Sequence, residues 1–166
     1  LVLFDTIVDL DFDNDGWVDL IAAGSLNQEP RLRRFRNDGR GTWSNEEFLP
    51  QEEADQPCTA LSPLDYDRDG DLDLVMGEHN KPSPELSELV IYENIDGFSA
   101  AWRKRLIYTG DEHHLGARLL DVEPDGDLDI ASIGYTHQRM MIYENLSGPG
   151  GLSAVPGPGS TVPPTR

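Results

Sequence analysis

One nine-residue acidic pattern occurs three times along this chain and sets the period of the elements around it. Each copy has carboxylates at positions 1, 3, 5 and 9 and a glycine at position 6, in residues 11–19, 65–73 and 121–129. Successive glycines are 54 and 56 residues apart, and each copy runs directly into an apolar stretch. Self-similarity at a fixed period indicates a repeat architecture, in which each unit buries its apolar face on the next. We refer to the three segments as the first, second and third loops.

The alternating carboxylates favour calcium as the ligand of these loops. Calcium takes about six to eight hard oxygen ligands in a tolerant geometry, and alternate residues of a tight loop can direct their oxygens to one point. Glycine at position 6 permits the sharp turn. Without a cation the clustered carboxylates repel, at about 4 kcal/mol for two charges 4 Å apart near a protein surface. An acidic surface turn is the alternative for any single copy, but three copies in register favour about three Ca²⁺ sites.

The expected ligands are the side chains at positions 1, 3, 5 and 9 and the backbone carbonyl at position 7. They are Asp11, Asp13, Asp15, Trp17 and Asp19; Asp65, Asp67, Asp69, Asp71 and Asp73; and Asp121, Glu123, Asp125, Asp127 and Asp129. The loops are not EF-hands, because position 12 is Ala22, Met76 or Ser132, where that motif needs a bidentate glutamate.

The same order of elements surrounds each loop. A short apolar run ended by glycine follows it, at residues 20–24, 74–77 and 130–134, which predicts a buried strand. A second strand ends at Asn37, Asn94 or Asn145 and is followed by a glycine turn. A further strand follows the turn in the first two repeats, and one more strand precedes each loop. About four short strands in each repeat is the content of one propeller blade.

We therefore expect an all-β fold of about three four-stranded antiparallel β-propeller blades in residues 1–146. Residues 147–166 are rich in proline and glycine and predict a flexible tail or linker. A propeller closes with about four to eight blades. The chain is thus expected to be a partial propeller or a fragment of a larger one, and the absence of an initiator methionine and of a signal-like segment predicts a processed or truncated piece. Exposed blade faces should drive self-association or packing on missing blades, through apolar strands such as residues 89–92.

Charge excludes some partners. The formal net charge is −18 among 166 residues, which argues against binding to nucleic acid or to an anionic membrane surface. No apolar run approaches the length of about 20 residues that inserts into a membrane. Cys58 is the only cysteine, so no internal disulfide can form, and one thiol does not decide the compartment.

The loops and the Tyr-Glu-Asn sequences ending at Asn94 and Asn145 resemble FG-GAP and VCBS-type repeats, including those of integrin-alpha-like propellers, over roughly residues 5–146. The resemblance implies a β-propeller, commonly seven-bladed, in a secreted or cell-surface protein, with calcium under the blades. It also implies recognition of a glycan or protein ligand, cell adhesion, or an accessory role in a larger protein. Glu123 stands for the usual aspartate and Pro124 lies beside it, so the third site is expected to be looser.

A propeller-fold polysaccharide lyase or other carbohydrate-active enzyme is the alternative function. Such an enzyme would use tyrosine, histidine and arginine, and Tyr135, His137 and Arg139 lie close together in one inter-strand loop. They would have to converge with a residue of another repeat, such as His79. Because the sequence has no serine–histidine or cysteine–histidine motif, a binding or structural module is favoured over an enzyme.

The first repeat differs from the others at two places. Trp17 stands at position 7, where it is expected to pack on a neighbouring strand, or alternatively to stack on a sugar or a partner. Arginines replace apolar or acidic residues of the second strand at Arg33, Arg34 and Arg36. We expect an edge strand that its charges keep soluble; the alternative is that these arginines face acids of a neighbour or an anionic ligand.

Overall fold

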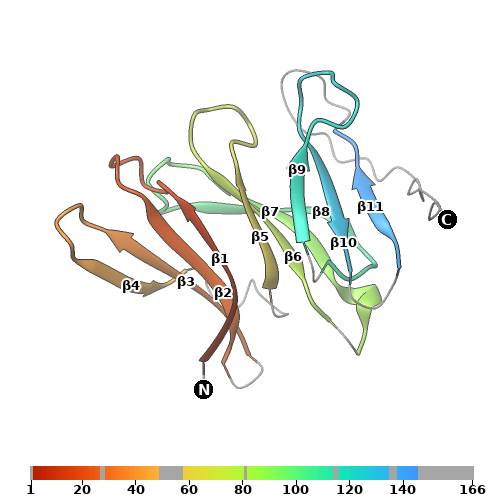
Figure 1. Cartoon of the computed structure of the whole chain (residues 1–166), viewed down its shortest axis with the longest axis horizontal. Coiled ribbons are helices and arrows are strands. Elements are labelled where there is room, and N and C mark those ends of the chain that lie inside the picture. The colour runs from red at the N-terminus through yellow and green to blue at the C-terminus, as the bar shows by residue number, and fades with distance from the viewer. Residues whose placement is uncertain are drawn as a thin grey trace.

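Three antiparallel sheets lie side by side in the computed structural model, which describes residues 2–26, 29–48, 58–80, 82–113, 116–134 and 138–145 (Figure 1). Blade 1 consists of β1 (Val2–Leu10), β2 (Asp19–Leu26), β3 (Glu29–Asn37) and β4 (Trp43–Glu47). Blade 2 consists of β5 (Cys58–Leu64), β6 (Asp73–Glu78), β7 (Glu88–Asn94) and β8 (Trp102–Thr109), with the 3₁₀ turn η2 (Pro84–Leu86) between β6 and β7. Blade 3 consists of β9 (Gly116–Leu120), β10 (Asp129–Ile133) and β11 (Met140–Tyr143).

Consecutive strands are hydrogen-bonded neighbours in every blade, which confirms the predicted all-β, three-blade architecture. A fourth strand for blade 3 would lie beyond Asn145, outside the described residues, as does the predicted tail at 147–166. No helix in the part of the chain that the structure describes has the length and apolar character to cross a membrane.

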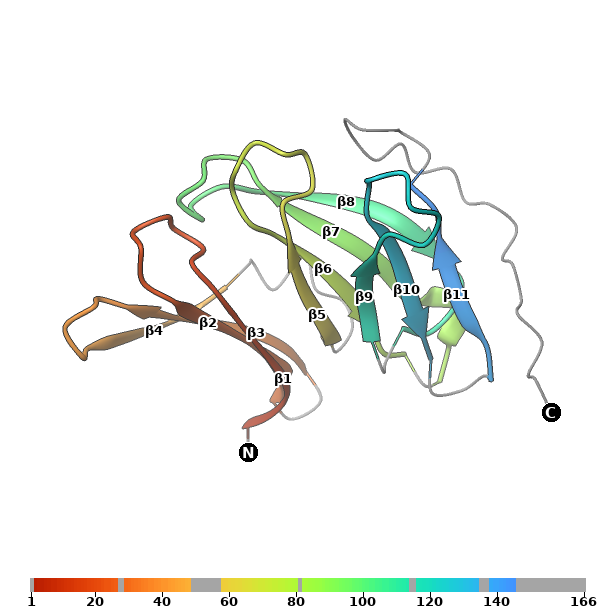
Figure 2. The same ribbon diagram turned by 45° about the horizontal axis from the view of Figure 1, so that its top comes forward.

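Each acidic loop connects the first two strands of its blade. The closing pairs are Leu10 with Asp19, Leu64 with Asp73 and Leu120 with Asp129. The three loops consequently lie at the same end of the three sheets, as both ribbon views show (Figures 1 and 2). Since the loops follow equivalent strands, the repeat in the sequence becomes a row of loops in space.

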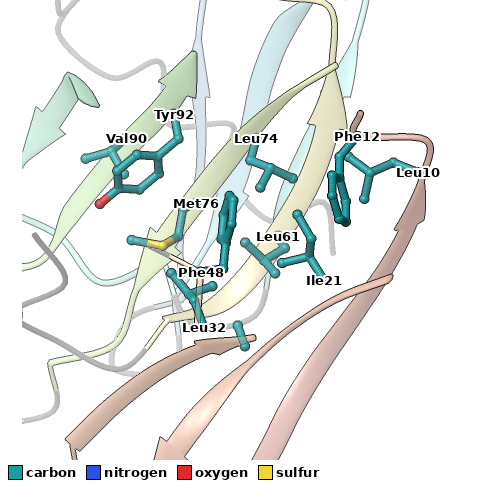
Figure 3. Packing of buried hydrophobic residues seen from close by; sticks show 11 residues of the cluster. Leu10, Phe12, Ile21, Leu32, Phe48, Leu61, Leu74, Met76, Val90 and Tyr92 are labelled. Atoms are coloured by element: carbon teal, nitrogen blue, oxygen red, sulfur yellow. The ribbon is translucent and has the colours of Figure 1, made fainter. Parts of the chain in front are cut away.

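Blade 2 is buried on both faces, which explains why its central strands are almost continuously apolar. Successive side chains of a strand point to opposite faces. Met76 and Tyr92 pack toward blade 1, against residues that include Ile21 and Phe48 (Figure 3). Val75 and Ile91 pack toward blade 3, against Ala117 and Ile130. The period-2 pattern is thus hidden in the sequence, because both sets of alternate residues need to be apolar.

This packing corrects the expectation that residues 89–92 would drive association between chains. Leu89, Val90, Ile91 and Tyr92 are at most 1% exposed and are already covered by blades 1 and 3. Exposed apolar side chains lie elsewhere on all three blades, with Leu106 of β8 in blade 2 being 52% exposed. Other examples are Ile7 on β1, which is 59% exposed, and Met140 on β11, which is 47% exposed.

The edge-strand interpretation of the first-repeat arginines is wrong. β3 lies inside its sheet, between β2 and β4. Its charges are accommodated because acids face them. Arg34 pairs with Glu46 of β4 at 2.6 Å, and Arg36 pairs with Asp13 of the first loop at 2.5 Å. The alternative expectation, arginines that face acids of a neighbouring element, describes the observed contacts.

Candidate metal centre

The aspartate at position 1 closes each loop through backbone N–H groups. Asp11 accepts hydrogen bonds from the N–H groups of Asp15 and Gly16, at 3.1 and 2.9 Å. Asp121 accepts the equivalent pair at 3.2 and 3.1 Å, and Asp65 accepts from Gly70 at 3.2 Å. Carboxylates that accept backbone N–H bonds are held in place before any ligand binds. The loop is therefore preorganised around its first carboxylate.

Two positions in each loop have left-handed backbone. The glycines at position 6 have φ between 88° and 99°. Position 4 is also left-handed, with φ of 55° at Asn14 and 62° at Arg68. The third loop has Pro124 there, with φ of 30°. A proline ring fixes φ near −65°, so the third loop is more strained at this position than the first two.

The aspartate at position 9 connects the loop to the end of the third strand. It accepts the backbone N–H of the asparagine that ends β3 or β7 or follows β11, at distances of 2.6, 2.7 and 2.8 Å. The three pairs are Asp19 with Asn37, Asp73 with Asn94 and Asp129 with Asn145. Asp73 also accepts the N–H of Tyr66 at 2.6 Å. The aspartate at position 9 thus has a structural role of its own, in which the recurrent asparagine is its hydrogen-bond donor.

In the first two loops, carboxylate oxygens from several positions converge. Those of Asp11, Asp13 and Asp15 lie within 4.8 Å of one another, and those of Asp65, Asp67 and Asp73 do the same. The structure thus brings together three of the four predicted acidic side chains in each of these loops. The fourth is Asp19 in the first loop and Asp69 in the second.

Some of these oxygens are buried and have no hydrogen-bond partner. They are Asp13 Oδ1, Asp19 Oδ2 and Asp65 Oδ1. An unpaired buried carboxylate oxygen is costly, because it has lost water without gaining a donor. A cation is the partner that would satisfy them, since no donor side chain among the described residues reaches these atoms. The residues present therefore fit a hard divalent ion in both loops.

Burial raises the pKa of several of these carboxyl groups. Desolvation raises the pKa of Asp73 to about 6, although the hydrogen bonds that it accepts from Asn94 and Tyr66 lower this pKa. Desolvation is also the first cause of the raised pKa of Asp13, Asp19 and Asp67, with neighbouring loop carboxylates adding to it. Carboxyl groups with raised pKa release protons when a cation binds.

The third loop differs from the other two. Its carboxylates form no group of three within 4.8 Å, although all nine of its residues are described. Glu123 is exposed, and its pKa is raised to about 7 by desolvation first and then by Asp129 and Glu144. Asp127, whose backbone was the predicted ligand, has a buried side chain with both oxygens unpaired.

In the first two loops, the position-7 side chain lies on the hairpin turn of its own blade. A Cβ at Gly39 would be 2.1 Å from Trp17 Cε2, and a Cβ at Gly97 would be 2.3 Å from Asp71 Oδ2. The glycines are therefore needed for close approach. The ring of Trp17 packs on the β3–β4 turn, where a neighbouring strand was expected, and the side chain stays 50% exposed.

Neighbouring loops are joined through position 4. The Nδ2 group of Asn14 donates to Asp71 Oδ1 at 2.6 Å and to the carbonyl of Gly97 at 3.0 Å. Arg68 donates to the carbonyl of Gly126 at 3.0 Å. A pocket of about 260 Å³ lies between the second and third loops, beside Arg68. Sequence reasoning did not find these contacts, because position 4 has a different residue in every copy.

The residues considered for an enzyme are only partly described. His79 pairs with buried Glu112, and Arg139 pairs with Asp111 at 2.6 Å. Tyr135 and His137 lie outside the described residues. The convergence that a catalytic site would require thus involves residues outside the described part of the chain. Cys58 is in β5, and its side chain is not described.

Comparison with protein families identifies residues 11–76 as an FG-GAP-like repeat. The match begins at the first residue of the first loop and ends inside β6, so it includes both loops whose carboxylates converge. The predicted family is confirmed over this segment. No curated protein sequence matches the chain.

Proposed function

We propose that this chain, which contains an FG-GAP-like repeat, is a calcium-stabilised β-propeller repeat module that presents a recognition surface outside the cell. Calcium binds in the first and second loops, and more weakly in the strained third loop. The ion holds the loops at one end of adjacent blades. The module binds a glycan or protein ligand, or serves as an accessory domain of a larger protein.

The observation that carries the calcium assignment is the set of buried carboxylate oxygens without a donor. They occur in all three loops, and in the first two they accompany three converging carboxylates. The chemical type of the ligand atoms also indicates which metal binds. Every candidate ligand is an oxygen, and neither histidine nor cysteine occurs in the loops. Oxygen-only sites suit calcium or magnesium, whereas zinc and copper favour nitrogen and sulfur. Loops that combine carboxylate and carbonyl oxygens suit the tolerant coordination of calcium better than the strict octahedron of magnesium.

The ion's role follows from where the loops are placed. Each loop joins the first two strands of a blade, and Asn14 and Arg68 connect one loop to the next. An ion that fixes a loop therefore also fixes the spacing of adjacent blades. The FG-GAP-like match supports an extracellular setting, as such repeats are typical of extracellular proteins. Calcium sites of extracellular modules commonly have Kd values of about 10⁻⁴–10⁻³ M.

Calorimetric titration of the metal-free chain with CaCl₂ tests the assignment. Binding should be measurable in the wild type and should lose one site in Asp67→Asn, which removes a converging carboxylate of the second loop. Glu85→Gln is the matched control, because it removes the same charge from η2, which lies outside the loops. Wild-type heats equal to dilution heats, or the same loss of a site in both variants, would refute the proposal.

A further inference from the structure

Blade 1 has a positive charge beside its acidic loop, at a place where the other blades have a negative one. Arg36 immediately precedes Asn37, and the equivalent residues of the other blades are Glu93 and Glu144. Arg36 Nε lies 2.5 Å from Asp13 Oδ2, and its terminal nitrogen lies 3.3 Å from Asp15 Oδ2. The guanidinium therefore neutralises two of the three carboxylates that converge in this loop.

Arg36 leaves part of the first loop unsatisfied. It contacts Asp13 through Oδ2, whereas Asp13 Oδ1 has no partner and the residue is only 7% exposed. Asp19, at 0% exposed, likewise has an unpaired Oδ2. These buried oxygens point to a ligand beyond the arginine. The loop is thus a cation site that already holds a competing positive group.

Arg68 at position 4 of the second loop donates to the carbonyl of Gly126, and no described cation forms a salt bridge with a carboxylate of the second loop. This loop carries five carboxylates, at positions 1, 3, 5, 7 and 9, whereas the first has four and Trp17 at position 7. Glu93, which stands in the place of Arg36, is held by Arg103 at 3.0 Å and by Arg105. The charge count of a loop sets its calcium affinity over several orders of magnitude.

We propose that Arg36 is an internal counter-ion that competes with calcium, so that the two loops form a low-affinity and a high-affinity site. This inference rests on the proposed function. The Arg36 side chain is 53% exposed, so it can swing into solvent when an ion enters the first loop. The second loop fills first, and the first loop responds only at higher calcium concentration. The blade 1–blade 2 junction is then completed in two steps.

The test uses the whole chain and compares Arg36→Gln with Arg33→Gln. Arg33 lies on the same strand but contacts Asn45 and Glu47 of β4, so its replacement changes the net charge without touching the loop. Terbium replaces calcium as a luminescent probe. Trp17 belongs to the first loop, whereas Trp102 pairs with Asn94 beside the second. All variants therefore carry Trp102→Phe, so that tryptophan-sensitised emission reports the first loop. Calorimetry with CaCl₂ counts the sites.

We expect Arg36→Gln to lower the midpoint of the tryptophan-sensitised signal on the order of tenfold, as one partly screened charge is removed. The midpoint should stay within about twofold of the wild-type value in Arg33→Gln. It should stay within about threefold in Arg36→Lys, which retains the charge. Wild-type calorimetry should show two unequal steps. Equal midpoints for Arg36→Gln and Arg33→Gln, or one class of equal sites in the wild type, would overturn the competition while leaving the calcium assignment intact. Absence of any binding to the wild type would overturn both.

Discussion

Raising the pH should destabilise the metal-free protein, which is the opposite of what ordinary surface aspartates would do. The folded-state pKa of Asp73 is about 6 and its ordinary value is 3.8, so the folded protein binds the proton more tightly than the unfolded chain. Stability therefore falls as the pH rises from about 4 through 6. Asp13, Asp19 and Asp67 shift in the same direction.

The size of the effect follows from the Asp73 values. Linkage between a folded pKa of about 6 and an unfolded value of 3.8 gives a loss of about 1 kcal/mol between pH 5 and pH 7 from this group alone. Saturating calcium should cancel the loss, because the ion binds the ionised carboxylates and its own affinity rises with pH. Between pH 5 and pH 7 the stability should therefore fall in the metal-free protein and stay nearly constant in calcium.

Urea unfolding at pH 5, 6 and 7 measures this directly, on protein stripped with a chelating resin and on protein in excess CaCl₂. Asp73→Asn is the comparison variant, because it removes the titrating group and should flatten the metal-free slope. Metal-free stability that is constant or increases over this range would show that the loop carboxylates are not desolvated as the structure has them.

Three further outcomes follow. Asp69→Ala should lose far more calcium affinity than Asp71→Ala, because Asp71 lies on Gly97 and accepts a bond from Asn14. Equal losses of affinity in calorimetry would show that the ligand positions within the loop are assigned wrongly. Gly77→Ala should destabilise the protein by about 1–3 kcal/mol in urea unfolding, because its Cβ would lie 2.9 Å from a backbone oxygen of His113. Identical urea unfolding curves for Gly77→Ala and the wild type would contradict that packing. The exposed terminal blades should make the chain self-associate with little salt dependence, and sedimentation of a monomer at high concentration would count against it.

The strand order and the loops could be predicted because the signals are local. A position-9 aspartate followed by an apolar run determines where β2, β6 and β10 begin, and the glycine turns determine the hairpins. The burial of residues 89–92 could not be predicted in the same way. A run that is apolar on both faces reads the same whether it meets another chain or, as here, lies between two blades of its own chain.

Side-chain partners across elements were harder to predict. The arginines of β3 were expected at an edge, because charge in a strand commonly means solvent. They lie inside the sheet because the first loop and β4 both supply acids to that face. The strain at Pro124 could have been found from the sequence, since the equivalent residues are Asn14 and Arg68 and proline cannot adopt their backbone comfortably.

Thermal unfolding in calcium and in chelator tests the central claim, that the acidic loops hold calcium and thereby stabilise the blades. An ion at about 100 times its Kd that binds only the folded form adds about 2.7 kcal/mol per site. Two filled loops would therefore contribute about 5 kcal/mol, which corresponds to roughly 10–20 °C in Tm for a chain of this size. We predict a drop of at least about 10 °C when calcium is replaced by excess chelator, reversed by calcium and only weakly by magnesium. Superimposable melting curves in calcium and in chelator would contradict the claim.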